Sequence, residues 1–133
     1  FLKIEKSKMI SWFEKNRGIS FLITIIIAAL IFYISSLTFP AGAGGGYLSY
    51  IYHFTVFSYL ALFLLISLSG GKPSKNLIIL SLILAIVYGI SDEIHQIFVP
   101  GRYYSIKDIL INSLGILITS IAYTNYCFGN NKK

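Results

Sequence analysis

One stretch of the sequence, YGISDEIHQIFVPGRYYSIKDILINSLG (88–115), holds most of the side chains that could carry out chemistry. Carboxyl and imidazole groups transfer protons in general acid–base catalysis, and Asp92, Glu93 and His95 place three of them within four residues. We take these three as candidate catalytic residues. Candidate binding residues for a polar or anionic substrate group come from the same stretch and from one upstream position: His53, Gln96, Arg102, Asp108 and Asn112.

Arg102 indicates what kind of group this site would bind. A guanidinium holds a phosphate or carboxylate through two parallel hydrogen bonds, so an anionic ligand is one expectation. A structural salt bridge to a neighbouring carboxylate is the other, and charged residues can also mark only where the lipid ends. Because no serine or cysteine stands in an evident base-paired motif, covalent catalysis has little support, and the sequence leaves open whether the protein is an enzyme.

Helical geometry predicts how these side chains would come together. At about 100° per residue, Asp92, His95 and Gln96 share one helix face, with Glu93 at its flank. Pro100 ends or bends this helix, because the residue before a proline is pushed out of α geometry. Asp108 begins the next helix and Asn112 lies one turn deeper, while His53 lies about two turns into an earlier one. We therefore expect one pocket lined by all the candidate residues.

Other site classes fit the sequence less well. Asp, Glu and His are competent metal ligands, but no metal-specific spacing such as HExxH occurs, and Cys127 stands alone. We accordingly expect no metal and no cofactor. The letters DEIH match an acidic helicase motif, yet no Gly-rich phosphate loop with Lys-Ser/Thr accompanies them, so we expect no nucleic-acid partner.

The rest of the chain is strongly apolar. Of its 133 residues 56% are hydrophobic and 12% are charged. A bilayer core needs ~20 helical residues, and backbone groups in lipid must pair internally. The pattern therefore predicts an all-α membrane protein, a bundle of four transmembrane helices. The third run is too short unless it continues through the polar stretch to about residue 99. The four runs are Ile19–Phe39, Tyr47–Ser69, Asn76–Ser91 and Ile109–Phe128.

The basic residues predict an orientation in the cell membrane. Nine lysines and arginines lie in the segments 1–17, 72–75 and 132–133, which four spans would place on one side of the membrane. The other two, Arg102 and Lys107, lie in the connection between the third and fourth spans, on the opposite side. Because Lys and Arg mark the cytoplasmic side, we expect both termini in the cytoplasm and the polar stretch at the outer face. The net charge of +6 then indicates contact with anionic lipid rather than nucleic acid.

The predicted organisation has three parts. Residues 1–17 form a cytoplasmic basic amphipathic segment, residues 18–128 form the four-helix transmembrane domain, and residues 129–133 form a cytoplasmic tail. The first segment should lie on the membrane surface as a helix. The side chains expected to face the lipid are Met9, Ile10, Trp12 and Phe13.

The polar stretch resembles the signature of the VanZ-like family of small membrane proteins. That signature runs roughly D-E-x-x-Q-x-F-x-P-G-R, then S-x-x-D, then N-x-x-G. Members also tend to carry a histidine in the second helix with an aromatic residue one turn later, as His53 and Phe57 do here. The resemblance implies a cell-envelope protein, in some members one that affects sensitivity to teicoplanin, and it supplies no settled reaction. The matching residues are Asp92, Glu93, Gln96, Phe98, Pro100, Gly101, Arg102, Ser105, Asp108, Asn112 and Gly115.

Two classes of function follow from these features. In the first, an outer-face polar pocket binds a lipid headgroup or envelope precursor, with or without acid–base chemistry on it. In the alternative, the protein is a small accessory subunit of a larger membrane complex. Its polar stretch would then be a structural clasp, and its basic N-terminal helix would dock on the partner. The expected partners are thus membrane lipid and, in the alternative, a larger membrane protein complex.

Overall fold

Helices make up most of the chain in a computed structural model that describes residues 5–38 and 46–131. The described residues contain no strand, so the predicted all-α class is confirmed. Residues 1–4, residues 39–45 between the first two predicted spans, and the last two lysines lie outside the described residues. The helices are α1 (Lys8–Lys15), α2 (Arg17–Ser35), α3 (Tyr47–Ser69), α4 (Lys75–Ile97) and α5 (Ile106–Asn131).

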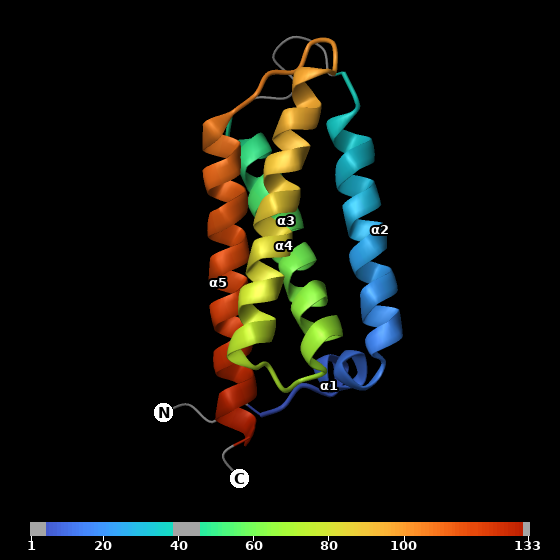
Figure 1. The fold of residues 1–133 in the computed structure, drawn as a ribbon, viewed down its shortest axis with the longest axis vertical. Helices are drawn as coiled ribbons and strands as arrows, with labels where there is room; N and C mark the ends of the chain where they lie inside the picture. The colour runs from blue at the N-terminus through green and yellow to red at the C-terminus, as the bar shows by residue number, and fades with distance from the viewer. Residues whose placement is uncertain (1–4, 39–45, 132–133) are drawn as a thin grey trace.

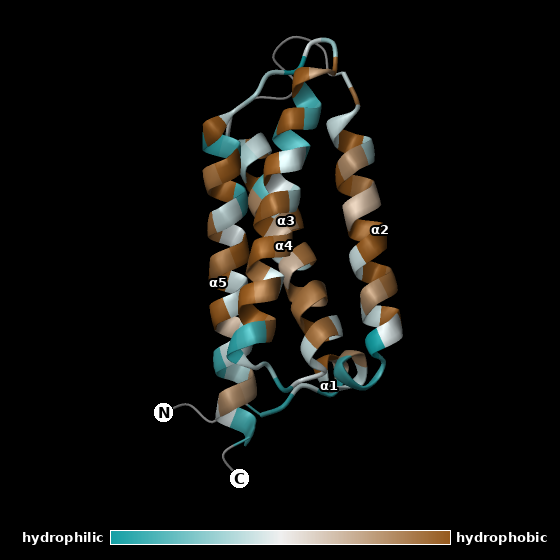
Figure 2. Cartoon of the chain, viewed as in Figure 1, coloured by the Kyte–Doolittle hydropathy of each residue, from teal (hydrophilic) through white to brown (hydrophobic). Residues whose placement is uncertain are grey.

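The four long helices run side by side, and successive helices run in opposite directions (Figure 1). Each is long and apolar enough to cross a membrane, with mean hydropathy between 1.4 and 2.5. Large apolar side chains such as Phe21, Ile83 and Ile121 lie exposed on the outside of the bundle, where hydrophobic colours prevail (Figure 2). Such a surface suits lipid rather than water. The chain is therefore an integral membrane protein.

The third apolar run does continue through the polar stretch. Helix α4 extends to Ile97 and stops before Pro100, as the restriction on a residue preceding proline requires. At its other end, the Ser74 hydroxyl accepts a hydrogen bond from the Leu77 backbone N–H at 3.3 Å and caps the helix. We call the two ends of the bundle the Pro100 end and the α1 end. The α1 end also holds the α3–α4 connection and the end of α5 (Figure 1).

Helix α3 lies at the centre, packed against α2, α4 and α5. Its buried side chains Phe57, Leu60 and Ala61 form the core with residues of the other helices. Gly115 lets α5 come close, since a Cβ at this position would lie 2.7 Å from the carbonyl oxygen of Phe54 on α3. Small residues are the usual means of close helix approach in membranes. This contact sets the spacing of α3 and α5 near the polar side chains.

The short helix α1 differs from its predicted orientation. Met9 and Trp12 are 68% and 49% exposed, as expected for side chains that face lipid. Ile10 and Phe13 were expected to face lipid too, but they pack against the bundle beside Leu65 and its neighbours. The expectation was wrong for these two residues, because the bundle offers α1 an apolar surface that competes with lipid.

A buried acid fastens α1 to the bundle. Glu14 is only 6% exposed and is held from both sides: the Lys6 amino group lies 2.8 Å from Oε2, and the Tyr123 hydroxyl donates to Oε1 at 2.9 Å. The hydrogen bond to Glu14 raises the pKa of Lys6 above its usual value. A Cβ on Gly71 would lie 2.7 Å from the Glu14 carboxyl carbon, so the α3–α4 connection closes directly over this acid.

Arg17 joins the start of α2 to the end of α3. Its Nε donates to the carbonyl oxygen of Ser67 at 2.8 Å, and its Nη2 donates to that of Leu68 at 2.7 Å. The last carbonyl groups of a helix have no partner within the helix, and a cation there also suits the helix dipole. Arg17 therefore caps α3 in addition to adding positive charge at this end.

Candidate functional site

Helix α4 buries three neighbouring polar side chains near its end. Glu93 is 0% exposed, and Asp92 and Gln96 are nearly as buried. The Gln96 amide donates to Glu93 Oε1 at 3.4 Å and to Asp92 Oδ2 at 3.5 Å, both long for hydrogen bonds. Oδ1 of Asp92 has no hydrogen-bond partner among the described residues, and the Ser35 hydroxyl donates to Phe32 instead. Two buried carboxylates are thus held loosely.

Helices α3 and α5 supply the facing groups. His53 is 2% exposed, and its Nδ1 lies 3.0 Å from Oδ1 of Asn112. Its Nε2 lies 3.5 Å from Oδ2 of Asp108. An amide oxygen can only accept a hydrogen bond, so in this arrangement Nδ1 carries the proton and Nε2 turns towards the acid.

The connection between α4 and α5 closes the site. The Ser105 backbone N–H donates to Glu93 Oε2 at 3.2 Å, and the Ser105 hydroxyl accepts from the backbone N–H of Asp108 at 3.2 Å. Ser105 therefore caps α5 while it orients the Glu93 carboxylate. Ligand-type atoms of His53, Glu93 and Asp108 all lie within 4.8 Å of one another. We call the whole group the polar cluster: His53, Asp92, Glu93, Gln96, Asp108 and Asn112.

The structure thus brings six of the eight candidate residues into the polar cluster. His95 turns away from the cluster, and Arg102 lies beside it, near enough to attract the Glu93 carboxylate electrostatically. The His95 ring stacks on Phe32 with centroids 4.4 Å apart, and its Nε2 lies 2.9 Å from the Ser36 hydroxyl. These contacts turn His95 towards α2. Arg102 donates from Nη1 to the carbonyl oxygen of Leu37 at 3.1 Å, which ties the connection after α4 to the segment after α2.

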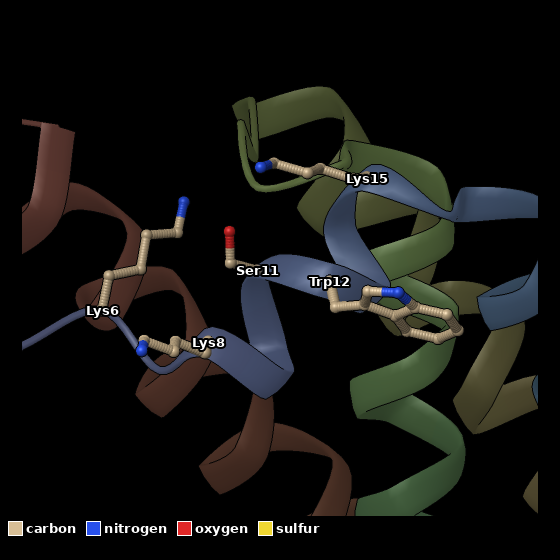
Figure 3. A pocket seen from close by; sticks show the side chains of 5 residues that line it. All are labelled: Lys6, Lys8, Ser11, Trp12 and Lys15. Atoms are coloured by element: carbon tan, nitrogen blue, oxygen red, sulfur yellow. The ribbon is translucent and has the colours of Figure 1, made fainter.

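The structure also has a groove at the α1 end that the sequence analysis did not predict. Three lysines and Trp12 line a groove around Ser11 (Figure 3). The buried Glu14 and Tyr123 behind it were also missed. One signal was present: Glu14 is an acid within a basic amphipathic segment, and α5 carries Tyr123 and Cys127 one helical turn apart. The lysines that line the groove are Lys6, Lys8 and Lys15.

Comparison with known proteins agrees with the motif in the polar stretch. The family model VanZ/LLP1 matches residues 8–128, and the chain belongs to this family. The match begins with α1 and so includes more of the chain than the motif around α4 and α5. Neither the curated proteins nor the solved structures compared with this chain gave a match.

Proposed function

We propose that this VanZ/LLP1 protein binds the headgroup of a membrane amphiphile, a phospholipid or a lipid-linked envelope precursor, at the Pro100 end of its bundle. The observation that carries the proposal is the polar cluster itself. Ionisable side chains inside a membrane protein cost several kcal/mol unless they are paired or used, and four of them meet here from three helices. A bundle that needed only to hold together would use apolar side chains at these positions.

Charge and access support the same proposal. Asp108 keeps 14% of its side chain exposed, so the cluster reaches the surface at the start of α5. Arg102 contributes a guanidinium at this end of the bundle, and guanidinium groups bind phosphate oxygens in pairs. A phosphate-bearing headgroup would then contact the Arg102 guanidinium rather than the buried acids, which repel an anion. In the cell, such binding would serve an envelope function, of which glycopeptide resistance is one form.

We infer further that the Pro100 end faces outwards and both termini face the cytoplasm. The nine-to-two division of basic residues supports this orientation. Single cysteines at Tyr103 and at Lys72, in a Cys127→Ser background, test it. A membrane-impermeant maleimide should label position 103 on intact cells and position 72 only after permeabilisation. The reverse pattern would contradict the orientation and put the polar cluster on the cytoplasmic side.

Lipid retention tests headgroup binding. The protein, purified in a mild detergent and mixed with lipids of defined headgroup, should keep a phosphate-bearing lipid in native mass spectrometry. Arg102→Gln should reduce this retention about tenfold or more, because a charge-assisted contact is lost. Lys107→Gln is the matched control, since it removes the other cation of the same end, and it should leave retention unchanged. Equal loss in both variants would indicate only general attraction to lipid.

The accessory-subunit alternative has one observation in its favour: hydrogen bonds of the polar cluster tie α3 to α5 and α4 to the segment before α5, as a structural clasp would. The double variant Glu93→Gln with Arg102→Gln separates the two functions. A clasp of opposite charges tolerates loss of both partners better than loss of one. If the double variant is stable but lipid retention and teicoplanin sensitivity stay altered, ligand binding is supported. Full recovery, with a stoichiometric protein partner on purification, would favour the subunit.

A further inference from the structure

We propose that His53, Glu93 and Asp108 bind a divalent transition-metal ion, Zn²⁺ or Mn²⁺. The three side chains come from α3, α4 and α5, and their ligand-type atoms lie within 4.8 Å of one another. The sequence led us to expect no metal because no single helix carries a metal-specific spacing. That criterion does not apply when each helix supplies one ligand, so the structure leads us to revise the expectation.

The orientation of His53 is the first argument. Its Nδ1 lies 3.0 Å from the amide oxygen of Asn112, which can only accept, so Nε2 is the ring nitrogen that faces Asp108. A cation can lie between Nε2 and the carboxylate, either as a proton on Nε2 or as a metal ion held by both groups. Metal-binding histidines almost always donate their other N–H to a carbonyl or carboxylate group, as His53 does to Asn112.

The separation of these atoms is the second argument. Nε2 of His53 and Oδ2 of Asp108 are 3.5 Å apart, too far for a charge-assisted hydrogen bond of about 2.7–2.9 Å. Two ligands that each lie about 2.1 Å from a tetrahedral metal ion are about 3.4 Å apart. The observed distance therefore suits two ligands of one ion.

The surroundings of Glu93 are the third argument. This carboxylate is fully buried, and its hydrogen bonds from Gln96 and Ser105 measure 3.4 and 3.2 Å. Such contacts orient a carboxylate without neutralising its charge, which is the usual role of groups around a metal ligand. Asp92, next in the chain and also buried, keeps an oxygen without a hydrogen-bond partner among the described residues.

The ligand set indicates which ions fit. Mg²⁺ and Ca²⁺ prefer shells of oxygen alone, whereas imidazole together with carboxylates suits Zn²⁺ and Mn²⁺. Three protein ligands also leave at least one coordination position for an outside group. A headgroup phosphate oxygen would suit that position. This last step rests on the proposed function, while binding of the ion itself does not.

Metal binding is tested on the full chain with the ion alone. The protein carries Cys127→Ser to remove the single thiol, is stripped with a chelator in detergent, and is then dialysed against Zn²⁺ or Mn²⁺. One equivalent should bind and should raise the unfolding temperature. His53→Gln and Asp108→Asn should weaken binding by about 100-fold or more, since the loss of an outer-shell partner alone costs 10- to 100-fold.

His95→Gln is the matched control. It removes the other histidine at the same end of the bundle, and the His95 side chain contacts α2 rather than the three proposed ligands. It should bind the ion as the parent does. If the parent binds no ion above a detergent blank, or if His95→Gln loses binding and His53→Gln does not, the inference is overturned.

A measurement on the wild-type chain keeps the test decisive if the variants fail to fold. X-ray absorption of the Zn²⁺-loaded protein should show nitrogen and oxygen ligands at about 2.0–2.2 Å. A sulfur ligand would place the ion at Cys127, away from the polar cluster, and would contradict the inference. Lipid retention measured with and without chelator separates the two proposals. Ion binding in the dialysis without retained lipid refutes only headgroup binding. Lipid retained by a protein that binds no ion in the dialysis refutes only the metal site, and equal retention with and without chelator refutes only contact between the ion and the headgroup.

Discussion

Two buried glutamates at opposite ends of the bundle have very different partners. Glu14, at the α1 end, forms an ion pair with the Lys6 amino group at 2.8 Å and accepts a hydrogen bond from the Tyr123 hydroxyl at 2.9 Å. Glu93, at the Pro100 end, accepts hydrogen bonds of 3.2 and 3.4 Å from a backbone N–H and an amide. Both are nearly or fully buried. Burial alone therefore assigns no role to either acid.

The difference lies in what completes each site. At the α1 end a cation and a phenol from the same chain satisfy the acid, and a glycine connection closes over it. At the Pro100 end, acids and a histidine face one another across three helices, with ligand-type atoms within 4.8 Å of one another, and we have proposed that an ion completes this site. Burying a charged group is costly, and ionisable groups in such environments cluster at functional sites. The comparison predicts opposite effects for matched substitutions at the two glutamates.

The largest effect should come from Glu93→Gln. We expect Zn²⁺ affinity to fall by about 100-fold or more, because a charged ligand is replaced by a neutral amide of the same shape. The free energy of unfolding of the metal-free protein should stay the same or rise, since a buried charge is removed. Equilibrium dialysis and denaturant titration in mixed micelles measure the two quantities. A metal-free protein that is strongly destabilised would make Glu93 a structural acid like Glu14.

Glu14→Gln should behave in the opposite way. We expect the free energy of unfolding to fall by about 1.5–3 kcal/mol, because hydrogen bonds to a charged group are lost. Metal and lipid binding at the Pro100 end should not change, since the two sites lie at opposite ends of the bundle. The same titration and dialysis measure both results. Loss of binding without loss of stability would contradict the division of roles.

Gly115→Ala tests whether close helix approach positions the polar cluster. The added methyl group would press on the α3 backbone at Phe54, and overpacking of this kind costs about 1–3 kcal/mol. Because Asn112 lies one turn away on α5, Zn²⁺ affinity should also fall. Gly129→Ala is the control, since a Cβ there meets nothing within 4 Å. It should leave stability and binding close to those of the parent.

The smallest effect should come from Tyr123→Phe. Removing this hydroxyl takes one of the two short contacts of Glu14 and leaves the Lys6 contact in place, so we expect a loss at the lower end of the range for a hydrogen bond to a charged group, about 1.5 kcal/mol. Thermal unfolding in detergent measures it. A larger loss than that of Glu14→Gln would mean that Tyr123, rather than the ion pair, holds α1 to the bundle.

Local patterns in the sequence determined the class of the protein and much of its outline. Three apolar runs of about the length that a bilayer requires predict spans whatever packs against them, and the shorter third run along the chain predicts one only if it continues through the polar stretch. Pro100 ends α4 through its own backbone chemistry. The motif around Glu93 likewise identified the family, because spacing along the chain is all that such a motif uses. The predicted orientation and the division into segments stay predictions.

Tertiary packing alone decided which side chains meet. His53 and His95 both stood as candidates, and the rotation of α4 turns His95 to Phe32, while the close approach of α3 and α5 brings His53 to Asp108. The sequence did not predict that Glu14 is buried, because its partners Lys6 and Tyr123 come from opposite ends of the chain. Contacts of this kind depend on how whole helices are rotated and spaced. No local pattern of residues encodes that, since each helix adjusts to the surfaces of all its neighbours.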